Sequence, residues 1–274
     1  MPIVFTRPAP IPTPWSLANV SFDTVINVSA EGSPSSVVFS VDGTKMYISG
    51  NVTDTIYQYT VLTPWDLATA SYATNKFVDV SLVAGGISGL AFKPDGTKMY
   101  VASRNSAKIF QYSLLTAWDV SSATYDIVLL NVVAQDVSPS DVFFKPDGLT
   151  MYIMGDANDT IYQYTLTVAW DLTAASYATI SFMETQNTQP LGMEISVDGT
   201  KLFLVGTSGA PSTPAVYQYT LVTPWLISSA NYDAVLFDTA SENIGITGIT
   251  MKNDGTKMYI SGVSANKEVN QYSL

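Results

Sequence analysis

The sequence predicts an all-β protein built as a closed ring of five four-stranded blades, and three observations lead to this prediction. Asp-Gly pairs recur with a period of about fifty residues, which suits a propeller blade or a solenoid repeat. They begin at Asp42, Asp95, Asp147, Asp198 and Asp254. Gln-Tyr pairs keep the same period, and four of them are followed by a tryptophan six residues after the tyrosine. The remaining tryptophan, Trp15, stands near the N-terminus, so the first segment is expected to complete the last repeat.

Each repeat contains four short strand patterns and no helical period. In the second repeat, the apolar run "GLAFKP" precedes an Asp-Gly turn signal, and the alternating segments "TKMYVAS" and "KIFQYSLL" follow. The β-branched run "ATYDIVLLNVV" supplies the fourth strand. Four strands in five copies predict a five-bladed β-propeller of about twenty strands.

The two ends of the chain are expected to share one blade. The chain stops at "NQYSL", just before the place of the next "TPWD", and "TPWSLANVSFDTVINVSA" around Trp15 supplies the missing piece. Closing the ring in this way leaves no open sheet edge. The expected divisions are a Pro-rich extended arm over 1–12, the outer strand of blade 5 over 13–30, blade 1 over 31–83, blade 2 over 84–135, blade 3 over 136–187, blade 4 over 188–243 and the rest of blade 5 over 244–274.

Composition argues against several classes of function. The chain has 12 Lys plus Arg against 23 Asp plus Glu, and its net charge of −11 opposes binding to nucleic acid or anionic lipid. It has no cysteine and no histidine, which removes disulfides, Ser-His-Asp catalysis and the commonest zinc ligand. No apolar stretch approaches the ~20 residues of a membrane span, and the early prolines do not fit a signal peptide. We therefore expect no cofactor, no metal and no membrane insertion.

The repeated hexapeptide "DGTKMY" is interpreted as a tight turn. Asp and Gly are expected at positions of positive φ, Thr and Lys in solvent, and Met and Tyr in the sheet packing. A calcium loop would need several oxygen ligands at alternate positions before the glycine, whereas the residues before Asp are Ser-Val, Lys-Pro or Lys-Asn. The hexapeptide is therefore expected to hold the fold rather than to perform chemistry.

Two interpretations of the five tryptophans remain open. Strictly periodic apolar positions in a repeat array form its continuous core, so each tryptophan is expected to fill the seam between two blades, with the following Asp capping a turn. A ring of exposed aromatic side chains would instead stack on sugars and gain from five weak sites. These candidate aromatic platforms are Trp15, Trp65, Trp118, Trp170 and Trp225.

The consensus "F-x-P-D-G-T-K-M-Y-V-x-G", followed by "I-Y-Q-Y-x-L-x-T-P-W-D", resembles the large group of TolB-like and YVTN-type β-propeller repeats, in a form similar to those of bacteriophage structural proteins and bacterial surface proteins. The resemblance covers residues 13–274 and implies the propeller fold. Propellers of this kind include ligand binders, lectins, hydrolases and scaffolds, so the resemblance leaves the function open.

The strand order places the loops on two different faces of the disc. Antiparallel strands that run from centre to rim put the Asp-Gly turns and the "TPWD" loops on one face, which we call the uniform face. The opposite, variable face holds the loops that differ between blades, and function is expected there. Its candidate ligand-binding residues are Asp136, Glu184, Asn187, Glu242 and Arg104. Asp141 and Glu194, on the innermost strands, are expected to point toward the central channel, where five-bladed glycoside hydrolases use carboxylates.

The preferred interpretation is a non-enzymatic structural or adhesion module, either a virion decoration or tail-associated protein or a bacterial surface protein. Its expected partner is a neighbouring virion or cell-surface protein, contacted through residues 1–12, or a glycan. The alternative is a carbohydrate-binding lectin, or a glycoside hydrolase that uses the central carboxylates. The expected location is a virion or a cell surface.

Overall fold

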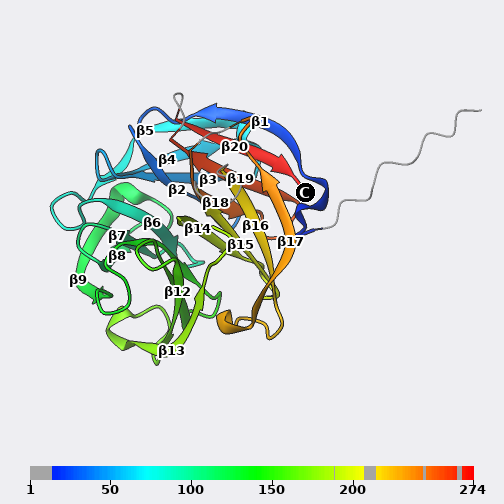
Figure 1. Ribbon diagram of the computed structural model, residues 1–274. Helices are drawn as coiled ribbons and strands as arrows, with labels where there is room; N and C mark the ends of the chain where they lie inside the picture. Colours follow the sequence, from blue (N-terminus) through cyan, green and yellow to red (C-terminus); the bar gives the residue numbers. More distant parts are fainter. Residues whose placement is uncertain (1–13, 188, 207–213, 243–244, 264–266) are drawn as a thin grey trace, which may run out of the picture.

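Five antiparallel sheets of four strands each stand around a common centre in the computed structural model (Figure 1). The structure describes residues 14–187, 189–206, 214–242, 245–263 and 267–274. The five-bladed β-propeller predicted from the repeats is confirmed. The only helices among the described residues are single 3-10 turns that precede the outer strands. The arm predicted over 1–12 lies outside the described residues.

The blades follow one another along the chain, and the strands of each blade run in order from the axis to the rim. Blade 1 consists of β2 (Pro34–Phe39), β3 (Lys45–Gly50), β4 (Thr55–Val61) and β5 (Ala70–Asp79). Blade 2 consists of β6 (Ile87–Phe92), β7 (Lys98–Ser103), β8 (Lys108–Leu114) and β9 (Ala123–Asn131). Blade 3 consists of β10 (Pro139–Phe144), β11 (Thr150–Gly155), β12 (Thr160–Leu166) and β13 (Ala175–Met183). Blade 4 consists of β14 (Pro190–Ile195), β15 (Lys201–Gly206), β16 (Ala215–Leu221) and β17 (Ala230–Asp238).

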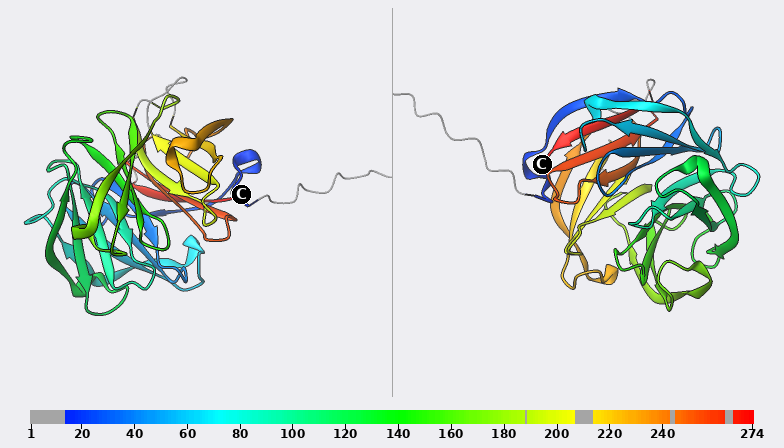
Figure 2. Two further views of the ribbon diagram at one scale, coloured as in Figure 1. Left: turned by 90° about the horizontal axis from the view of Figure 1, so that it is seen from below. Right: turned by 180° about the vertical axis from the view of Figure 1, so that it is seen from behind.

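Blade 5 joins the two ends of the chain. Its strands are β18 (Ile246–Met251), β19 (Lys257–Gly262), β20 (Glu268–Ser273) and, outermost, β1 (Ser21–Asn27). β1 pairs with β20 in antiparallel register, and the views from two sides show it along the outer edge of that strand (Figure 2). The predicted closure of the last blade by the N-terminal strand is therefore confirmed.

In the Asp-Gly turns, only the glycine has the positive φ that was predicted for both residues. The glycines have φ between 70° and 73°, as expected, but the aspartates are not among the residues with positive φ. Asp42 Oδ1 instead accepts hydrogen bonds from Thr44 N at 3.0 Å and from Ser40 Oγ at 2.6 Å. An aspartate that accepts from the backbone two residues ahead stabilises a turn in its ordinary conformation. The prediction of positive φ for Asp was wrong, whereas Met46 and Tyr47 are fully buried as expected.

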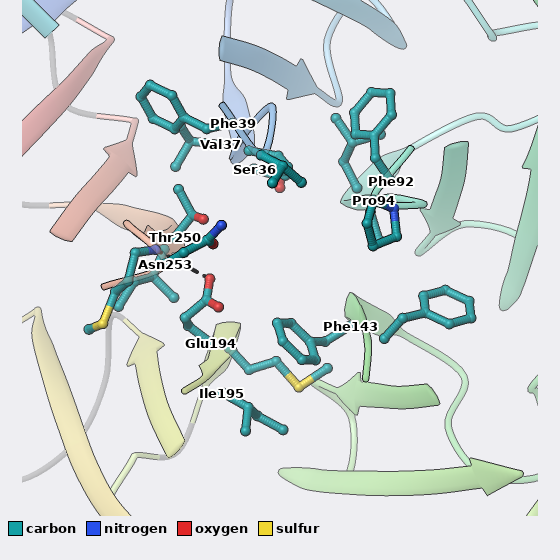
Figure 3. Close-up of a pocket in the computed structure, with 18 of the residues that line it drawn as sticks. Ser36, Val37, Phe39, Phe92, Pro94, Phe143, Glu194, Ile195, Thr250 and Asn253 are labelled. Carbon is teal, nitrogen blue, oxygen red and sulfur yellow. Dashed lines mark hydrogen bonds between the residues drawn. The ribbon is translucent and has the colours of Figure 1, made fainter. Parts of the chain in front are cut away.

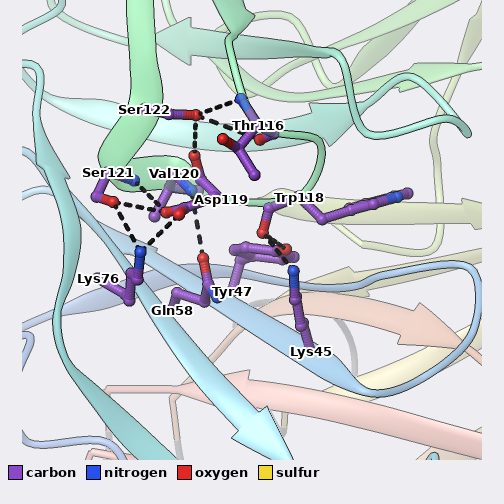
Figure 4. Close-up of polar contacts among 10 residues, drawn as sticks. All are labelled: Lys45, Tyr47, Gln58, Lys76, Thr116, Trp118, Asp119, Val120, Ser121 and Ser122. Carbon is purple, nitrogen blue, oxygen red and sulfur yellow. Dashed lines mark hydrogen bonds and ion pairs between the residues drawn. The ribbon is translucent and has the colours of Figure 1, made fainter.

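The Gln-Tyr pairs join neighbouring blades (Figure 4). Gln58 Oε1, on blade 1, accepts a bond of 3.2 Å from Val120 N, which follows the tryptophan loop of blade 2. The same bond closes all five seams, with lengths of 2.8 to 3.2 Å, at Gln58, Gln111, Gln163, Gln218 and Gln271. A buried backbone N–H without a partner would be costly, so these glutamines fix the loop of the next blade.

A tyrosine of the Asp-Gly hairpin adds a second bond at four seams. Tyr47 Oη donates to the Trp118 carbonyl at 2.7 Å, and the other donors are Tyr100, Tyr152 and Tyr259. At the seam between blades 4 and 5 the equivalent residue is Phe203, whose ring lies 6.2 Å from that of Trp15. The seam between blades 4 and 5 therefore lacks the tyrosine hydroxyl that donates a hydrogen bond at each of the other four seams.

Candidate functional site

An axial cavity of about 180 Å³ opens on the uniform face (Figure 3). Its walls are the inner strands β2, β6, β10, β14 and β18, and its mouth is bordered by the residue that precedes each Asp-Gly pair. These mouth residues are Val41, Pro94, Pro146, Val197 and Asn253. In the sequence they are recognisable only as turn residues, and function was expected on the variable face, so this opening was not predicted.

One position of the inner strands sets the chemistry of the cavity wall. The fifth residue of these strands lines the cavity in every blade, and the five residues are Val38, Ala91, Phe143, Glu194 and Thr250. Figure 3 shows Phe143, Glu194 and Thr250 directed into the central space. Glu194 is thus the single carboxyl at this level, in a wall that is otherwise apolar except for Thr250.

Glu194 is half-buried and hydrogen-bonded to blade 5. Its Oε2 accepts a bond from Met251 N at 3.3 Å, and its carboxyl also bonds to the Thr250 side chain. Burial, with a smaller contribution from the nearby carboxyl of Asp141, raises the pKa of Glu194 to about 8 in spite of these hydrogen bonds.

Asp141 lies two residues earlier along its inner strand than the position of Glu194, at a level where neighbouring inner strands are in close contact. The equivalent residues in the other blades are small, and a Cβ added to one of them, Gly89, would lie 2.6 Å from the Asp141 Cα. Asp141 is 8% exposed, and its oxygens accept bonds from Met193 N at 2.9 Å and from Val142 N at 2.8 Å. Burial raises the pKa of Asp141 to about 7 in spite of these bonds. Asp141 and Glu194, which were expected to point toward the central channel, are both among the residues that line this cavity.

A second opening of about 150 Å³ lies on the variable face at the other end of the axis. Arg104 and Asn105 border it together with the serines of the inner strands. Arg104 Nη1 lies 3.6 Å from Asp156 Oδ2. Burial raises the pKa of Asp156, and Arg104 opposes this shift. Arg104 therefore borders the opening on the variable face, whereas Glu194 lines the axial cavity that opens on the uniform face.

Three of the candidate residues on the variable face are buried and brace the loops. Asp136 is 1% exposed, and its carboxylate accepts bonds from Ser138 N at 2.7 Å and from Asn158 N at 3.0 Å. Glu184 accepts a bond from Asn187 N at 3.1 Å, and Asn187 Oδ1 accepts one from Gln189 N at 3.0 Å. Asp136 thus joins its own loop to the loop between β11 and β12, which contains Asn158, whereas Glu184 and Asn187 accept bonds from the backbone of their own loop.

Three more acidic residues, Glu242, Glu31 and Asp54, lie in loops of the variable face. Glu242 is half-buried, and its backbone N–H donates to Thr239 O at 3.1 Å. Glu31 and Asp54 were not among the predicted residues, yet they brace loops in the same way as Asp136, through Ser33 N at 2.9 Å and Gly86 N at 2.6 Å. A usable signal was present, because Glu31 and Asp136 each stand three residues before the proline that begins an inner strand.

The tryptophans lie in the seams between blades. Their φ values are 58° to 65°, and each indole covers the glycine of an Asp-Gly turn so closely that a Cβ on Gly148 would lie 2.2 Å from Trp170 Nε1. Trp170 is 8% exposed, and the other four are half-buried. The following residue caps a turn where it is aspartate, as in Asp119, which accepts from Ser121 N at 3.1 Å. Trp65, Trp118 and Trp225 also border the axial cavity.

Neither a metal-binding cluster nor a membrane-spanning helix occurs within the described part of the chain. Its His, Cys, Asp and Glu residues form no group of three that could hold a metal ion. None of its helices is long and apolar enough to cross a bilayer.

The comparisons with known proteins concern the fold. No family model and no curated protein gives a significant match to the chain. Among solved structures it is similar to a "putative 6-phosphogluconolactonase" from Bacteroides uniformis, at 13% identity and a TM-score of 0.51, over 84% of this chain and 63% of that one. It is also similar to the hydrazine synthase of Kuenenia stuttgartiensis, at 18% identity and a TM-score of 0.50, over 84% of this chain and 55% of that one. The chain spans less than two thirds of the length of both, and at these identities the similarity shows the propeller-like fold alone.

Proposed function

We propose that this chain is a non-enzymatic recognition module of structural or adhesion type, which contacts a virion or cell-surface partner through its uniform face. The observation that carries this proposal is the axial cavity on a face that also exposes large apolar side chains. These side chains are Val41, Leu62, Leu115, Val168, Val197 and Val222. The variable face also exposes apolar side chains, such as Val52 and Leu82, so the axial cavity with its mostly apolar wall is what distinguishes the uniform face as a binding surface.

The use of the repeated residues supports a binding role. The glutamines and tyrosines of the repeat form hydrogen bonds between neighbouring blades, and the tryptophans pack in the same seams. The two axial carboxyls accept bonds from backbone amides. The exposed apolar side chains of the loops and the wall of the axial cavity are therefore free to contact other molecules, and the cavity places such a contact on the uniform face.

One observation favours glycoside hydrolysis as a second candidate. Asp141 and Glu194 come from neighbouring inner strands, and their pKa values of about 7 and about 8 lie near neutral pH, where an acid and base pair would operate. The burial of Asp141 and its two backbone partners favour the binding role over this one. Polysaccharide hydrolysis that disappears in Glu194→Gln would establish the hydrolase and refute the non-enzymatic proposal.

A matched pair of leucines tests the recognition role. Leu115 is 93% exposed on the uniform face, and Leu82 is 99% exposed on the variable face. We expect the wild type and Leu82→Glu to sediment with virions or cell envelopes of the source, and Leu115→Glu to lose at least about tenfold of this association, because a charge is costly to bury in an apolar contact. Equal melting temperatures of the two variants would show that both fold.

Two results would contradict the proposal. One is equal association of Leu115→Glu and Leu82→Glu, which would exclude the uniform face. The other is a wild-type protein found in neither fraction. A saturable signal on a glycan panel that is lost in Trp118→Phe would point instead to the lectin alternative.

A further inference from the structure

We propose that the axial cavity binds an alkylammonium group, with the cation held by Glu194 and the alkyl chain packed against the aromatic and aliphatic wall. This proposal rests on the recognition role of the uniform face and names the chemistry that the centre of that face would accept. The ammonium group would come from a small molecule or from a lysyl side chain of a partner.

Charge complementarity is the first argument. The described residues that line the cavity include two carboxyls, those of Asp141 and Glu194, and no lysine or arginine. β18 has no charged side chain, and the lysines near the cavity have other partners. Lys201 of β15 pairs with Asp233 at 2.8 Å, and Lys145, beside the mouth, pairs with Asp147 at 2.8 Å and lies 5.9 Å from the centre of the Trp225 ring. Lys45 donates to the Trp118 carbonyl at 3.1 Å. Among the described residues, the ion pairs include neither Asp141 nor Glu194.

The wall supplies the second argument. Phenylalanines from three blades line the cavity, namely Phe39, Phe92, Phe143 and Phe144, together with valine, isoleucine and methionine side chains. Aromatic rings attract a cation and also remove an alkyl chain from water. A volume of about 180 Å³ is below the usual ~300–1,000 Å³ of ligand pockets, which suits a short amine rather than an oligosaccharide.

The protons on the two carboxyls give the binding a distinctive signature. Burial favours their protonated forms, because an ionised carboxylate in an apolar site is costly without a partner. A bound ammonium would compensate that charge, so its binding would release protons from the pair at neutral pH. A neutral ligand of the same shape would release none. Proton release is therefore a signature that simple filling of an apolar cavity does not produce.

Isothermal titration calorimetry of the full chain would test this inference with n-butylammonium chloride and with 1-butanol, which has the same alkyl chain and no charge. At pH 7 we expect 1:1 binding of n-butylammonium, and binding of 1-butanol that is at least about tenfold weaker. Titrations in phosphate and in Tris should differ in heat, because these buffers take up released protons with different enthalpies. Affinity for n-butylammonium should rise from pH 6 to pH 8 as the carboxyls ionise.

Two variants assign the site. Glu194→Gln keeps the shape of the side chain and should weaken n-butylammonium binding at least about tenfold. Asp238→Asn removes an exposed carboxylate at the end of β17 and should bind as the wild type does. Nα-acetyl-lysine N-methylamide separates the two sources of the ammonium group. Binding comparable to that of n-butylammonium would indicate a lysyl side chain, and binding of n-butylammonium alone would indicate a small molecule.

Equal affinities for n-butylammonium and 1-butanol would overturn the inference, as would unchanged binding by Glu194→Gln or the absence of binding by the wild type. None of these results would affect the proposed recognition role, which is judged by the fractionation of Leu115→Glu and Leu82→Glu.

Discussion

Raising the pH from 5 to 9 is expected to destabilise this protein, and Glu194→Gln is expected to remove about half of the loss. The reason is the burial of Asp141 and Glu194, which raises their pKa values to about 7 and about 8 in the folded chain. A carboxyl of this kind keeps its proton in the folded state and loses it in the unfolded state. Its stabilising contribution is fully present below the unfolded pKa, near 4, and is lost as the pH rises through the folded pKa.

The magnitude follows from the interval between pH 5 and each folded pKa. At ~1.4 kcal/mol per pH unit, Asp141 accounts for about 3 kcal/mol of lost unfolding free energy and Glu194 for about 4 kcal/mol. The range from pH 5 to pH 9 suits this measurement because the chain has no histidine and no cysteine, so these side chains do not change the unfolding free energy with pH. Tyrosines such as Tyr100 titrate above it, since burial raises their pKa values further.

Urea unfolding followed by tryptophan fluorescence at pH 5, 6, 7, 8 and 9 would measure this effect. The wild type should lose several kcal/mol across the series, Glu194→Gln about half as much, and the control Asp238→Asn as much as the wild type. A wild-type stability that stays flat or rises with pH would refute the burial of the axial pair. Equal slopes for the wild type and Glu194→Gln would refute the assignment of the effect to Glu194.

Three changes test the way the ring is held together, each by the unfolding free energy or the state of association. Phe203→Tyr should stabilise the protein by about 1 kcal/mol, because the new hydroxyl would reach the Trp15 carbonyl as its counterparts do at the other four seams; a loss of stability would show that this seam has no room for it. Ile127 is exposed and has a φ of 62°, a conformation that is unfavourable for a β-branched residue. Ile127→Asn should therefore raise the unfolding free energy by about 1 kcal/mol in thermal or urea unfolding, and an unchanged value would mean that the backbone there is not strained. A chain that starts at residue 31 lacks β1 and exposes the edge of β20, so size-exclusion chromatography should show aggregates, whereas a monomer of unchanged melting temperature would contradict the role of β1 in closure.

Much of the architecture was predictable because its signals are local and repeated five times. Turn chemistry at the Asp-Gly pairs, strand alternation and the position of Trp15 were enough to predict five blades and a shared last blade. The same period predicted that the tryptophans fill seams. It did not predict how the Gln-Tyr pairs work, because the bond from Val120 to Gln58 joins residues of different blades and depends on how those blades meet.

The candidate site was predictable only in part. Asp141 and Glu194 were recognisable as departures from the repeat on inner strands, and both line the axial cavity. Asp136 and Glu184 look equally functional in sequence, but in the structure their oxygens accept bonds from backbone N–H groups of loops on the variable face. A carboxylate that binds a ligand and a carboxylate that stabilises a loop can belong to the same residue type. Only the positions of nearby N–H groups in the structure distinguish the two roles.

The sequence by itself determined the class of the fold, the number of blades, the closing strand and the absence of histidine and cysteine chemistry. These properties follow from residue types and from their spacing along one repeat, which set local backbone conformation and the face on which each side chain lies. Only the tertiary structure decided that an acidic, aromatic-walled cavity opens on the uniform face, and that its carboxyls hold their protons near neutral pH. Burial and electrostatic environment are properties of all five blades together, because five inner strands must meet before Glu194 has a wall opposite it.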